Sequence, residues 1–345
     1  MAEITGALPI PDHFDPDRVG EVWRVEYAGL AAAARRWAQE HGVRPAEADE
    51  RRLCLLLVDV QNTFCIPGYE LFVAGRSGRG AVEDNVRLCR FLYRNLGAVT
   101  VVRATLDTHT PFQIFHPAFW IDEQGEHPEA LTAIRVEDVE RGHWRVDPRA
   151  AQSLGYDARD ELDAYALHYV RRLAEAGKYD LMIWPYHALL GGPSHALVSA
   201  VHEAVFFHSI ARSCETRYEI KGDRPLTEHY SALRPEVTRD HRGRRIAAEN
   251  AQLVETLLEY DAVVVAGQAK SHCLAWTIED LLGDIRERDP ELARKVYLLE
   301  DCTSPVVIPG AVDFTEEADR AFARFAEAGV HVVRSTDSLA DWAGF

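Results

Sequence analysis

The chain has 345 residues, of which 47% are hydrophobic, 27% charged and 9% aromatic. It can therefore bury a large core, and it is neither disordered nor of low complexity. This length allows two domains of about 100–200 residues each, or one domain enlarged by extensions and insertions. The formal charge of −17, without a basic stripe, excludes nucleic acid as an expected partner.

The sequence shows no sign of export, of a membrane span or of disulfide bonds. The N-terminus has no basic region followed by an apolar one, and no apolar run approaches the length of about 18 residues that a membrane span needs. We therefore expect neither secretion nor contact with a membrane. The six cysteines are scattered without a C-x-x-C pair, which argues against a disulfide scaffold and favours the cytoplasm.

The predicted elements alternate between strands and helices. Residues 1–50 are expected to form an N-terminal extension, with one amphipathic helix within 22–43. The next run, Leu53–Val58, is continuously apolar, which is typical of a strand covered on both faces. Later strands are predicted at Val99–Ala104, Leu181–Trp184, Arg217–Lys221, Ala262–Ala266, Val296–Glu300 and Val330–Val333. Helices are predicted at Val82–Leu96, Ala196–Ile210, Asn250–Glu259, Cys273–Arg286 and Thr315–Ala328.

This alternation predicts an α/β fold with three α/β/α layers around a mainly parallel, Rossmann-like sheet of about six strands. The charged segment from about 110 to 178, with a helical pattern at Asp160–Ala176, interrupts the alternation. We interpret it as an insertion without a second core, inside a single domain spanning 51–345. The insertion and the extension are expected to cover the site or to form a subunit contact in a homo-oligomer.

Reactive side chains follow the predicted strands. In parallel α/β sheets ligands bind at the carboxyl ends of the strands, so these side chains should share one edge of the sheet. They are Asp59, Asp107, His109, His187, Lys221 and Cys273.

Cys273 opens a predicted helix, where the helix N-terminus stabilises a thiolate. A single cysteine is more often a buried, inert thiol. Lys221, which can lower the thiol pKa, and Asp59, which can accept the thiol proton, strengthen the hypothesis of a nucleophile. Taken singly, Asp59 is more typical of a helix cap and Lys221 of a solvated surface charge.

Asp107, His109 and His187 offer one carboxylate and two imidazoles, a set that suits zinc, iron or manganese with positions left for water or substrate. The D-x-H spacing brings both side chains to one face only if the segment is extended. His116 is the alternative third ligand. A lone histidine is more often an ordinary polar residue.

The clusters DVQNTF, LDTH, WPYH, IKGDRPLTEHYSAL and AGQAKSHC, in this order, resemble the isochorismatase-like cysteine hydrolases, in particular their nicotinamidase (pyrazinamidase) branch. The resemblance covers roughly residues 53–109, 179–232 and 250–335. It implies the isochorismatase-like hydrolase fold, a catalytic triad and a site for one divalent metal. The implied triad is Asp59, Lys221 and Cys273, and the implied ligands are Asp107, His109 and His187.

The resemblance also implies a cis peptide between Gln268 and Ala269, and hydrolysis of a small-molecule amide, nicotinamide, to nicotinate and ammonia through a cysteine thioester. We expect the backbone N–H groups of His272 and Cys273 to form the oxyanion hole. Expected walls of the substrate pocket, for which ordinary core packing is an equal alternative, are Phe64, Trp184 and Tyr230.

The chain departs from the family pattern next to these motifs, at Ala188, Lys270, Ser271 and His272. These positions flank the expected pocket. Two alternatives to a nicotinamidase therefore stay open. One is a hydrolase of the same fold acting on another small amide or carbamoyl compound, and the other is a non-catalytic binding protein of this fold.

Overall fold

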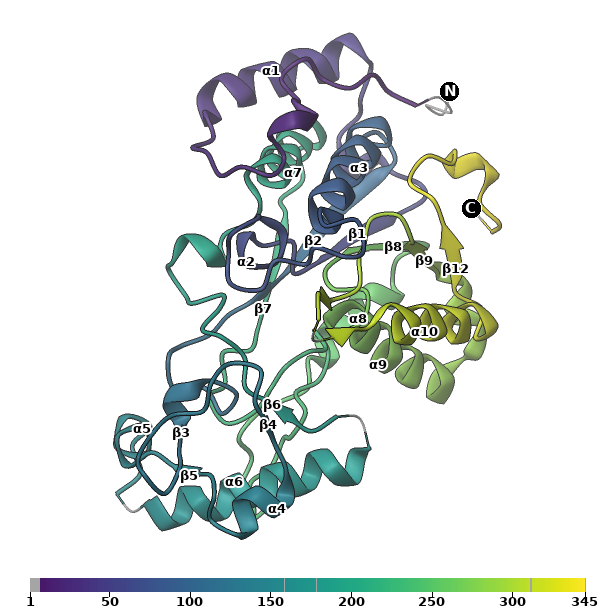
Figure 1. The fold of residues 1–345 in the computed structure, drawn as a ribbon. Helices are drawn as coiled ribbons and strands as arrows, with labels where there is room; N and C mark the ends of the chain where they lie inside the picture. Colours follow the sequence, from purple (N-terminus) through teal and green to yellow (C-terminus); the bar gives the residue numbers. More distant parts are fainter. Residues whose placement is uncertain (1–6, 158, 178, 311, 345) are drawn as a thin grey trace.

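The computed structural model describes residues 7–157, 159–177, 179–310 and 312–344. Its centre is a six-stranded, all-parallel sheet in the order β12-β9-β8-β1-β2-β7 (Figure 1). The strands are β1 (Leu53–Val58), β2 (Val99–Asp107), β7 (Arg217–Lys221), β8 (Ala262–Gly267), β9 (Val296–Leu299) and β12 (His331–Val333). The prediction of a parallel sheet of about six strands is confirmed.

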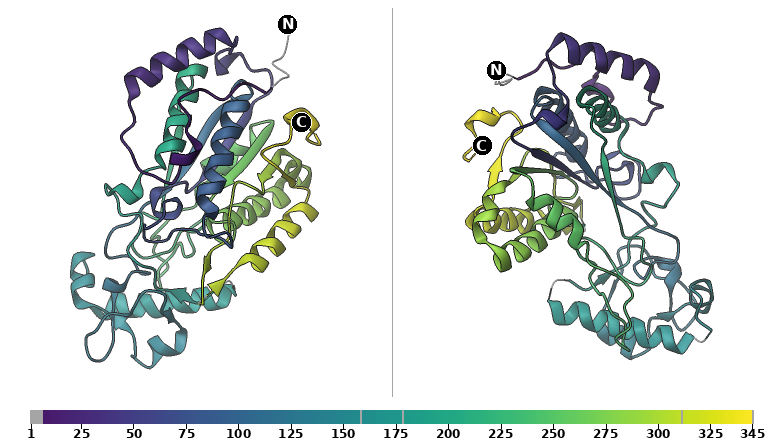
Figure 2. Two further views of the ribbon diagram at one scale, coloured as in Figure 1. Left: turned by 45° about the horizontal axis from the view of Figure 1, so that its top comes forward. Right: turned by 180° about the vertical axis from the view of Figure 1, so that it is seen from behind.

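Helices cover both faces of this sheet, as the three-layer prediction requires (Figures 1 and 2). The side chains of β1 alternate, so that Leu53, Leu55 and Leu57 join one hydrophobic cluster while Cys54, Leu56 and Val58 join another. The first cluster includes helices α1 (Tyr27–Glu40), α3 (Gly80–Arg94) and α7 (Ser199–Arg212). The second includes α8 (Ala251–Leu258), α9 (Cys273–Arg288) and α10 (Thr315–Glu327).

The strand predicted at Leu181–Trp184 is not part of the central sheet. Only β6 (Leu181–Met182) forms there, and it pairs antiparallel with β4 (Ala133–Ile134). The next backbone N–H groups also turn away from the central sheet, since Ile183 donates to Thr132 and Trp184 donates to Phe115. Pro185 follows and has no N–H to continue a ladder. The prediction was wrong because the run is too short to compete with these local partners.

The segment predicted to be an insertion without a core lies at the bottom of Figure 1. It is the main part of a separate hydrophobic cluster, which Leu181, Ile183, Leu226 and Val237 complete. Trp120, Tyr165 and Tyr169 are among its fully buried side chains. The elements of the segment are β3 (Trp120–Ile121), α4 (Val136–Glu140), β5 (Arg145–Val146), α5 (Pro148–Ser153) and α6 (Arg159–Ala176). The aromatic members of the cluster come from separate parts of the chain, with Phe119 and Trp120 around β3 and Tyr165 and Tyr169 on α6, so no single sequence pattern marked the cluster.

Three further short elements are α2 (Asn62–Cys65), β10 (Val307–Ile308) and β11 (Val312–Asp313), and the described residues also form short 3-10 helices. β10 and β11 form a two-stranded antiparallel pair. No helix within the described ranges is long and apolar enough to cross a bilayer.

Candidate active site

Asp59 follows β1 directly and is fully buried. Its φ of 48° is left-handed, a conformation that Asp adopts more readily than most residues. The Asp59 N–H donates to Thr105 Oγ1 (3.0 Å), and the Thr105 hydroxyl donates to Asp59 Oδ1. Burial raises the pKa of Asp59, although Lys221 opposes the shift. The carboxyl group is thus fixed in place and has a raised affinity for a proton.

Lys221 ends β7 and is only 2% exposed. Its Nζ lies 2.9 Å from Asp59 Oδ2 and 2.9 Å from Asp107 Oδ1. The same ammonium donates to the carbonyl of His229 (2.9 Å) and lies 3.6 Å from Cys273 Sγ. Burial alone would lower the pKa of Lys221, but Asp107 and Asp59 hold it well above its usual value. One charged ammonium therefore contacts three of the predicted site residues.

Cys273 is the first residue of α9, as predicted. Burial raises the pKa of its thiol well above the usual value and outweighs the opposing effect of Lys221. The sequence predicted a lowered thiol pKa from the helix terminus and the lysine. This prediction was wrong, because burial of the thiol has the larger, opposite effect. A thiol that keeps its proton needs a base close by to become a nucleophile.

The backbone at the start of α9 corrects the predicted oxyanion hole. His272 N–H donates to the carbonyl of Ala269 (3.0 Å), so it is not free for a substrate oxygen. Among the described residues no acceptor contacts the N–H of Ala269 or of Cys273. The peptide between Gln268 and Ala269 is cis, where the resemblance placed such a bond.

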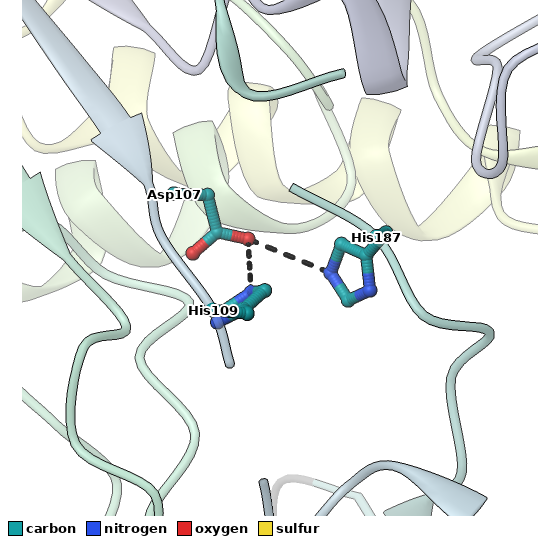
Figure 3. Close-up of side chains that lie close together, drawn as sticks. All are labelled: Asp107, His109 and His187. Carbon is teal, nitrogen blue, oxygen red and sulfur yellow. Dashed lines mark hydrogen bonds and ion pairs between the residues drawn. The ribbon is translucent and has the colours of Figure 1, made fainter. Parts of the chain in front are cut away.

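Asp107, His109 and His187 lie together at the carboxyl ends of the strands (Figure 3). Asp107 Oδ2 is 2.8 Å from His109 Nε2 and 3.6 Å from His187 Nε2. The three possible ligand atoms all lie within 4.8 Å of one another. β2 extends to Asp107, three residues beyond its predicted end, which gives the D-x-H pair the extended backbone that it needs.

The donor set fits a divalent cation. His187 Nδ1 donates to the carbonyl of Pro185 (2.8 Å), which leaves Nε2 without a proton and facing the carboxylate. His109 Nδ1 lies 3.1 Å from the carbonyl of Gly222, which suits the same tautomer. Such outer partners orient metal-binding histidines. A Cβ at Gly222 would lie 2.6 Å from His109 Cε1, so only glycine leaves room for this ring.

The electrostatics of Asp107 agree with a cation site. Burial alone would raise its pKa, but His109 and Lys221 hold it well below the usual value. Asp107 is therefore a carboxylate at neutral pH, and its Oδ2 faces both imidazoles.

His116, the alternative third ligand, lies beside this cluster but outside the group within 4.8 Å. Its Nδ1 is 3.1 Å from the carbonyl of Thr110, and its Nε2 is buried with no partner among the described residues. Its ring centroid is 5.6 Å from that of His187. Burial, His187 and His109 lower the pKa of His116 to about 2. The geometry favours His187 over His116 as the third ligand.

A cavity of about 330 Å³ joins the thiol to the Asp-His-His cluster, within the range typical of small-molecule sites. All three predicted wall residues line it. The ring of Phe64 lies 5.9 Å from that of His187, and Trp184 Nε1 donates to Tyr230 Oη (2.7 Å).

Several lining residues were missed by sequence reasoning. They are Tyr69, Glu70, Leu71, Phe72, Val73, Phe115, Glu228, His229, Val306 and Ile308. Glu228 and His229 belong to the IKGDRPLTEHYSAL cluster and could have been named from it. The others lie on loops, in the inserted segment and on β10, where no motif marks them.

No protein-family model and no curated protein matches this chain. Among solved structures, it is similar to a nicotinamidase/pyrazinamidase from Acinetobacter baumanii, with 20% identity over 84% of this chain and 100% of that one and a TM-score of 0.48. A yeast nicotinamidase has 18% identity over 81% and 99% of the two chains and a TM-score of 0.48. An isochorismatase-like hydrolase from Alkaliphilus metalliredigens has 11% identity over 85% and 99% and a TM-score of 0.42.

The chain is similar to nicotinamidases and isochorismatase-like hydrolases. These are the hydrolases that its motifs resemble.

Proposed function

We propose that this protein is a metal-dependent cysteine amidohydrolase of the nicotinamidase type, which converts nicotinamide and water to nicotinate and ammonia. The observation that carries the proposal is the buried ammonium of Lys221. It contacts the carboxylate of Asp59, lies 3.6 Å from Cys273 Sγ and contacts Asp107 of the Asp-His-His cluster. A base, a thiol and a candidate metal site thus meet at one cavity.

The reaction begins with the thiol of Cys273. Asp59 accepts the thiol proton, which its raised pKa favours, and the ammonium of Lys221 stabilises the thiolate. The sulfur then attacks the amide carbon of the substrate. Arginine would replace Lys221 poorly, because its planar fork would pair bidentately with Asp59 and occupy the base.

The tetrahedral intermediate carries an oxyanion. We assign its stabilisation to the N–H groups of Ala269 and Cys273, for which no acceptor is found among the described residues; one such donor contributes about 3–4 kcal/mol in comparable sites. The C–N bond breaks, and ammonia leaves with the proton held by Asp59. Water, deprotonated by the same carboxylate, hydrolyses the thioester and returns the proton to sulfur.

Asp107, His109 and His187 would hold one divalent metal ion, of which zinc, iron and manganese suit the donor set. When bound, the metal would supply a Lewis acid that could orient a substrate ring through its nitrogen. Phe64 and Trp184 are the walls that would hold a flat ring against the thiol. Positioning of this kind raises the reaction rate, because the substrate and the thiol are already held at the distance and orientation that the attack requires.

The proposal includes further expectations. The six cysteines are all free and five of them are buried, which agrees with a reducing compartment such as the cytoplasm.

We also propose one hydrolase domain at 51–345, an extension at 1–50 and an insertion at about 110–178. Assembly into a homo-oligomer stays a prediction that analytical ultracentrifugation can test.

Release of ammonia from nicotinamide and pyrazinamide by metal-loaded protein tests the proposal, with the Cys273→Ala variant as the blank. We expect turnover by the wild type and none by the variant. No turnover of any pyridine amide by metal-loaded wild type would contradict a nicotinamidase.

A second candidate is the hydrolysis of another small amide or carbamoyl compound. Lys270 and Ser271 depart from the family pattern just before the nucleophile, and the ring of His272 lines the cavity. Assays with aliphatic amides and carbamoyl compounds beside the pyridine amides separate the two. If no compound is turned over and Cys273 shows ordinary reactivity toward iodoacetamide, a binding protein of this fold is the better account.

A further inference from the structure

One residue of the cavity wall, Glu228, carries a carboxyl group that the mechanism does not use. Glu228 lines the cavity and is 2% exposed. It is held by two tyrosines, because Tyr230 Oη donates to Oε1 (2.7 Å) and Tyr169 Oη donates to Oε2 (3.0 Å). Tyr169 comes from α6 of the inserted segment. The orientation of Glu228 is therefore fixed from both sides.

Among the described residues, this carboxyl group has no positive partner. No Lys, Arg or His forms an ion pair with Glu228 among the described residues, and the nearby acidic group, Glu236, adds repulsion. Burial, its largest cause, and Glu236 together raise the pKa of Glu228 to about 8. Buried carboxyl groups are usually paired with a positive group. A ligand with a positive or hydrogen-donating group could therefore supply the partner that Glu228 does not have among the described residues.

The cavity offers the charge and the space for such a group. As a carboxylate, the form that a bound ammonium would favour, Glu228 has about four acceptor positions. The hydroxyls of Tyr230 and Tyr169 use two of them, and Trp184 also interacts with this group. Lys221 cannot neutralise Glu228, because Asp59 and Asp107 already pair with it. No arginine of the described part of the chain lines the cavity, so an acidic substituent would meet no arginine on this wall.

We propose that Glu228 is a specificity-determining residue that binds an amino or ammonium nitrogen carried by the substrate away from its reacting amide. The preferred substrates would then be amino-substituted heteroaromatic amides, with nicotinamide itself as a poorer one. This inference rests on the proposed amidohydrolase function and names the substrate class of the same site.

The experiment compares kcat/KM for nicotinamide with that for its ring-amino and aminomethyl isomers and for a carboxyl-substituted isomer. We expect at least one amino isomer to exceed nicotinamide by about tenfold or more, as one hydrogen bond donated by a charged ammonium group allows, and the carboxyl isomer to be the poorest. Glu228→Gln keeps the shape and should lose about tenfold of this preference. Tyr169→Phe removes one support of Glu228 but keeps the carboxyl group, and should retain the preference.

A purely structural role for Glu228 predicts a different result. Both variants would then lower the melting temperature while the ratio between amino isomer and nicotinamide stayed at its wild-type value, and that outcome overturns the inference. Calorimetric binding of the same amides to Cys273→Ala gives the ratio without turnover. The inference therefore fails on equal binding of amino and unsubstituted amides, whereas the proposed function fails on absent ammonia release.

Discussion

The carboxyl edge of the central sheet and the inserted segment both reach the cavity, but they contribute different things. The sheet edge supplies charged and reactive groups that contact one another, with Lys221 between Asp59 and Asp107. The inserted segment supplies most of a separate hydrophobic cluster and hydroxyl groups that hold the loop after β7, through Tyr165 and Tyr169. The comparison suggests that the sheet determines the reaction and the inserted segment the choice of substrate.

The loop after β7 belongs to both regions. Lys221 begins it at the end of the sheet, and Leu226 joins the hydrophobic cluster of the inserted segment. Two residues later, Glu228 lies in the cavity wall under the hydroxyl of Tyr169. A change in the inserted segment can therefore reach the cavity without touching the reactive groups.

The largest expected effect tests the sheet edge. Cys273→Ala should reduce turnover of any substrate by about 10⁶-fold, the loss seen when a covalent nucleophile is removed, measured as ammonia release. Cys214→Ala is the matched control, because that half-buried thiol lies outside the cavity. If Cys273→Ala were as active as the wild type, Cys273 would not be the nucleophile, and the reactive groups at the sheet edge would not carry out the reaction.

The next effect concerns metal binding. His187→Ala should weaken the affinity for a divalent metal by more than about 100-fold, the upper end of the loss seen for an outer partner, because it removes one of three donors within 4.8 Å. The metal content after dialysis, measured by mass spectrometry, tests this. His116→Ala should retain the metal, and the reverse pattern would make His116 the third ligand.

A smaller effect should appear in the pH dependence of stability. His208 of α7 is buried, and its Nε2 donates to the carbonyl of Val99 (2.8 Å). Burial lowers its pKa from 6.5 to about 4. The unfolded chain binds this proton first, so the contribution of His208 to stability is present above pH 6.5 and is lost as the pH falls toward 4. The shift corresponds to about 3 kcal/mol.

The test compares urea unfolding of wild type and His208→Gln at pH 7.5 and pH 4.5. Glutamine can donate to Val99 but does not titrate, so the variant should lose less stability between the two values. Other buried histidines with lowered pKa, such as His272 at about 4, act equally in both proteins. Parallel losses in the two proteins would show that His208 does not carry the acid sensitivity.

The sequence was most informative where chain geometry alone decides the outcome. Continuous apolar runs such as Leu53–Val58 can be satisfied only inside a covered parallel sheet, so strand positions and the placement of reactive residues at strand ends follow. The prediction failed for Leu181–Trp184, whose backbone groups find partners in the inserted segment. The prediction that His272 N–H belongs to the oxyanion hole also failed. In the folded chain this N–H donates to the carbonyl of Ala269 instead.

Desolvation could not be predicted from motifs. The thiol of Cys273 has a lysine and a helix terminus beside it, yet burial raises its pKa, and burial depends on packing by distant segments. The hydrophobic cluster of the inserted segment was missed for a similar reason. Its members become neighbours only when α6 packs against Trp120, Leu181 and the loop after β7.

The smallest expected effect tests the inserted segment. Tyr165 is 1% exposed and donates from Oη to the carbonyl of Leu226 (2.6 Å). Tyr165→Phe should lower the free energy of unfolding by about 1 kcal/mol, the usual value for one hydrogen bond, and loosen the loop that carries Glu228. Tyr156→Phe is the control within the same segment, because no hydrogen bond to the Tyr156 hydroxyl is found among the described residues.

If the inserted segment governs only the choice of substrate, Tyr165→Phe should raise KM severalfold and leave kcat nearly unchanged. Amide hydrogen exchange should become faster in residues 226–230 and stay unchanged in β1 and β2, whose ladders do not depend on that contact. A fall in kcat with unchanged KM would instead mean that the loop after β7 transmits strain to Lys221, so that the two regions share the reaction.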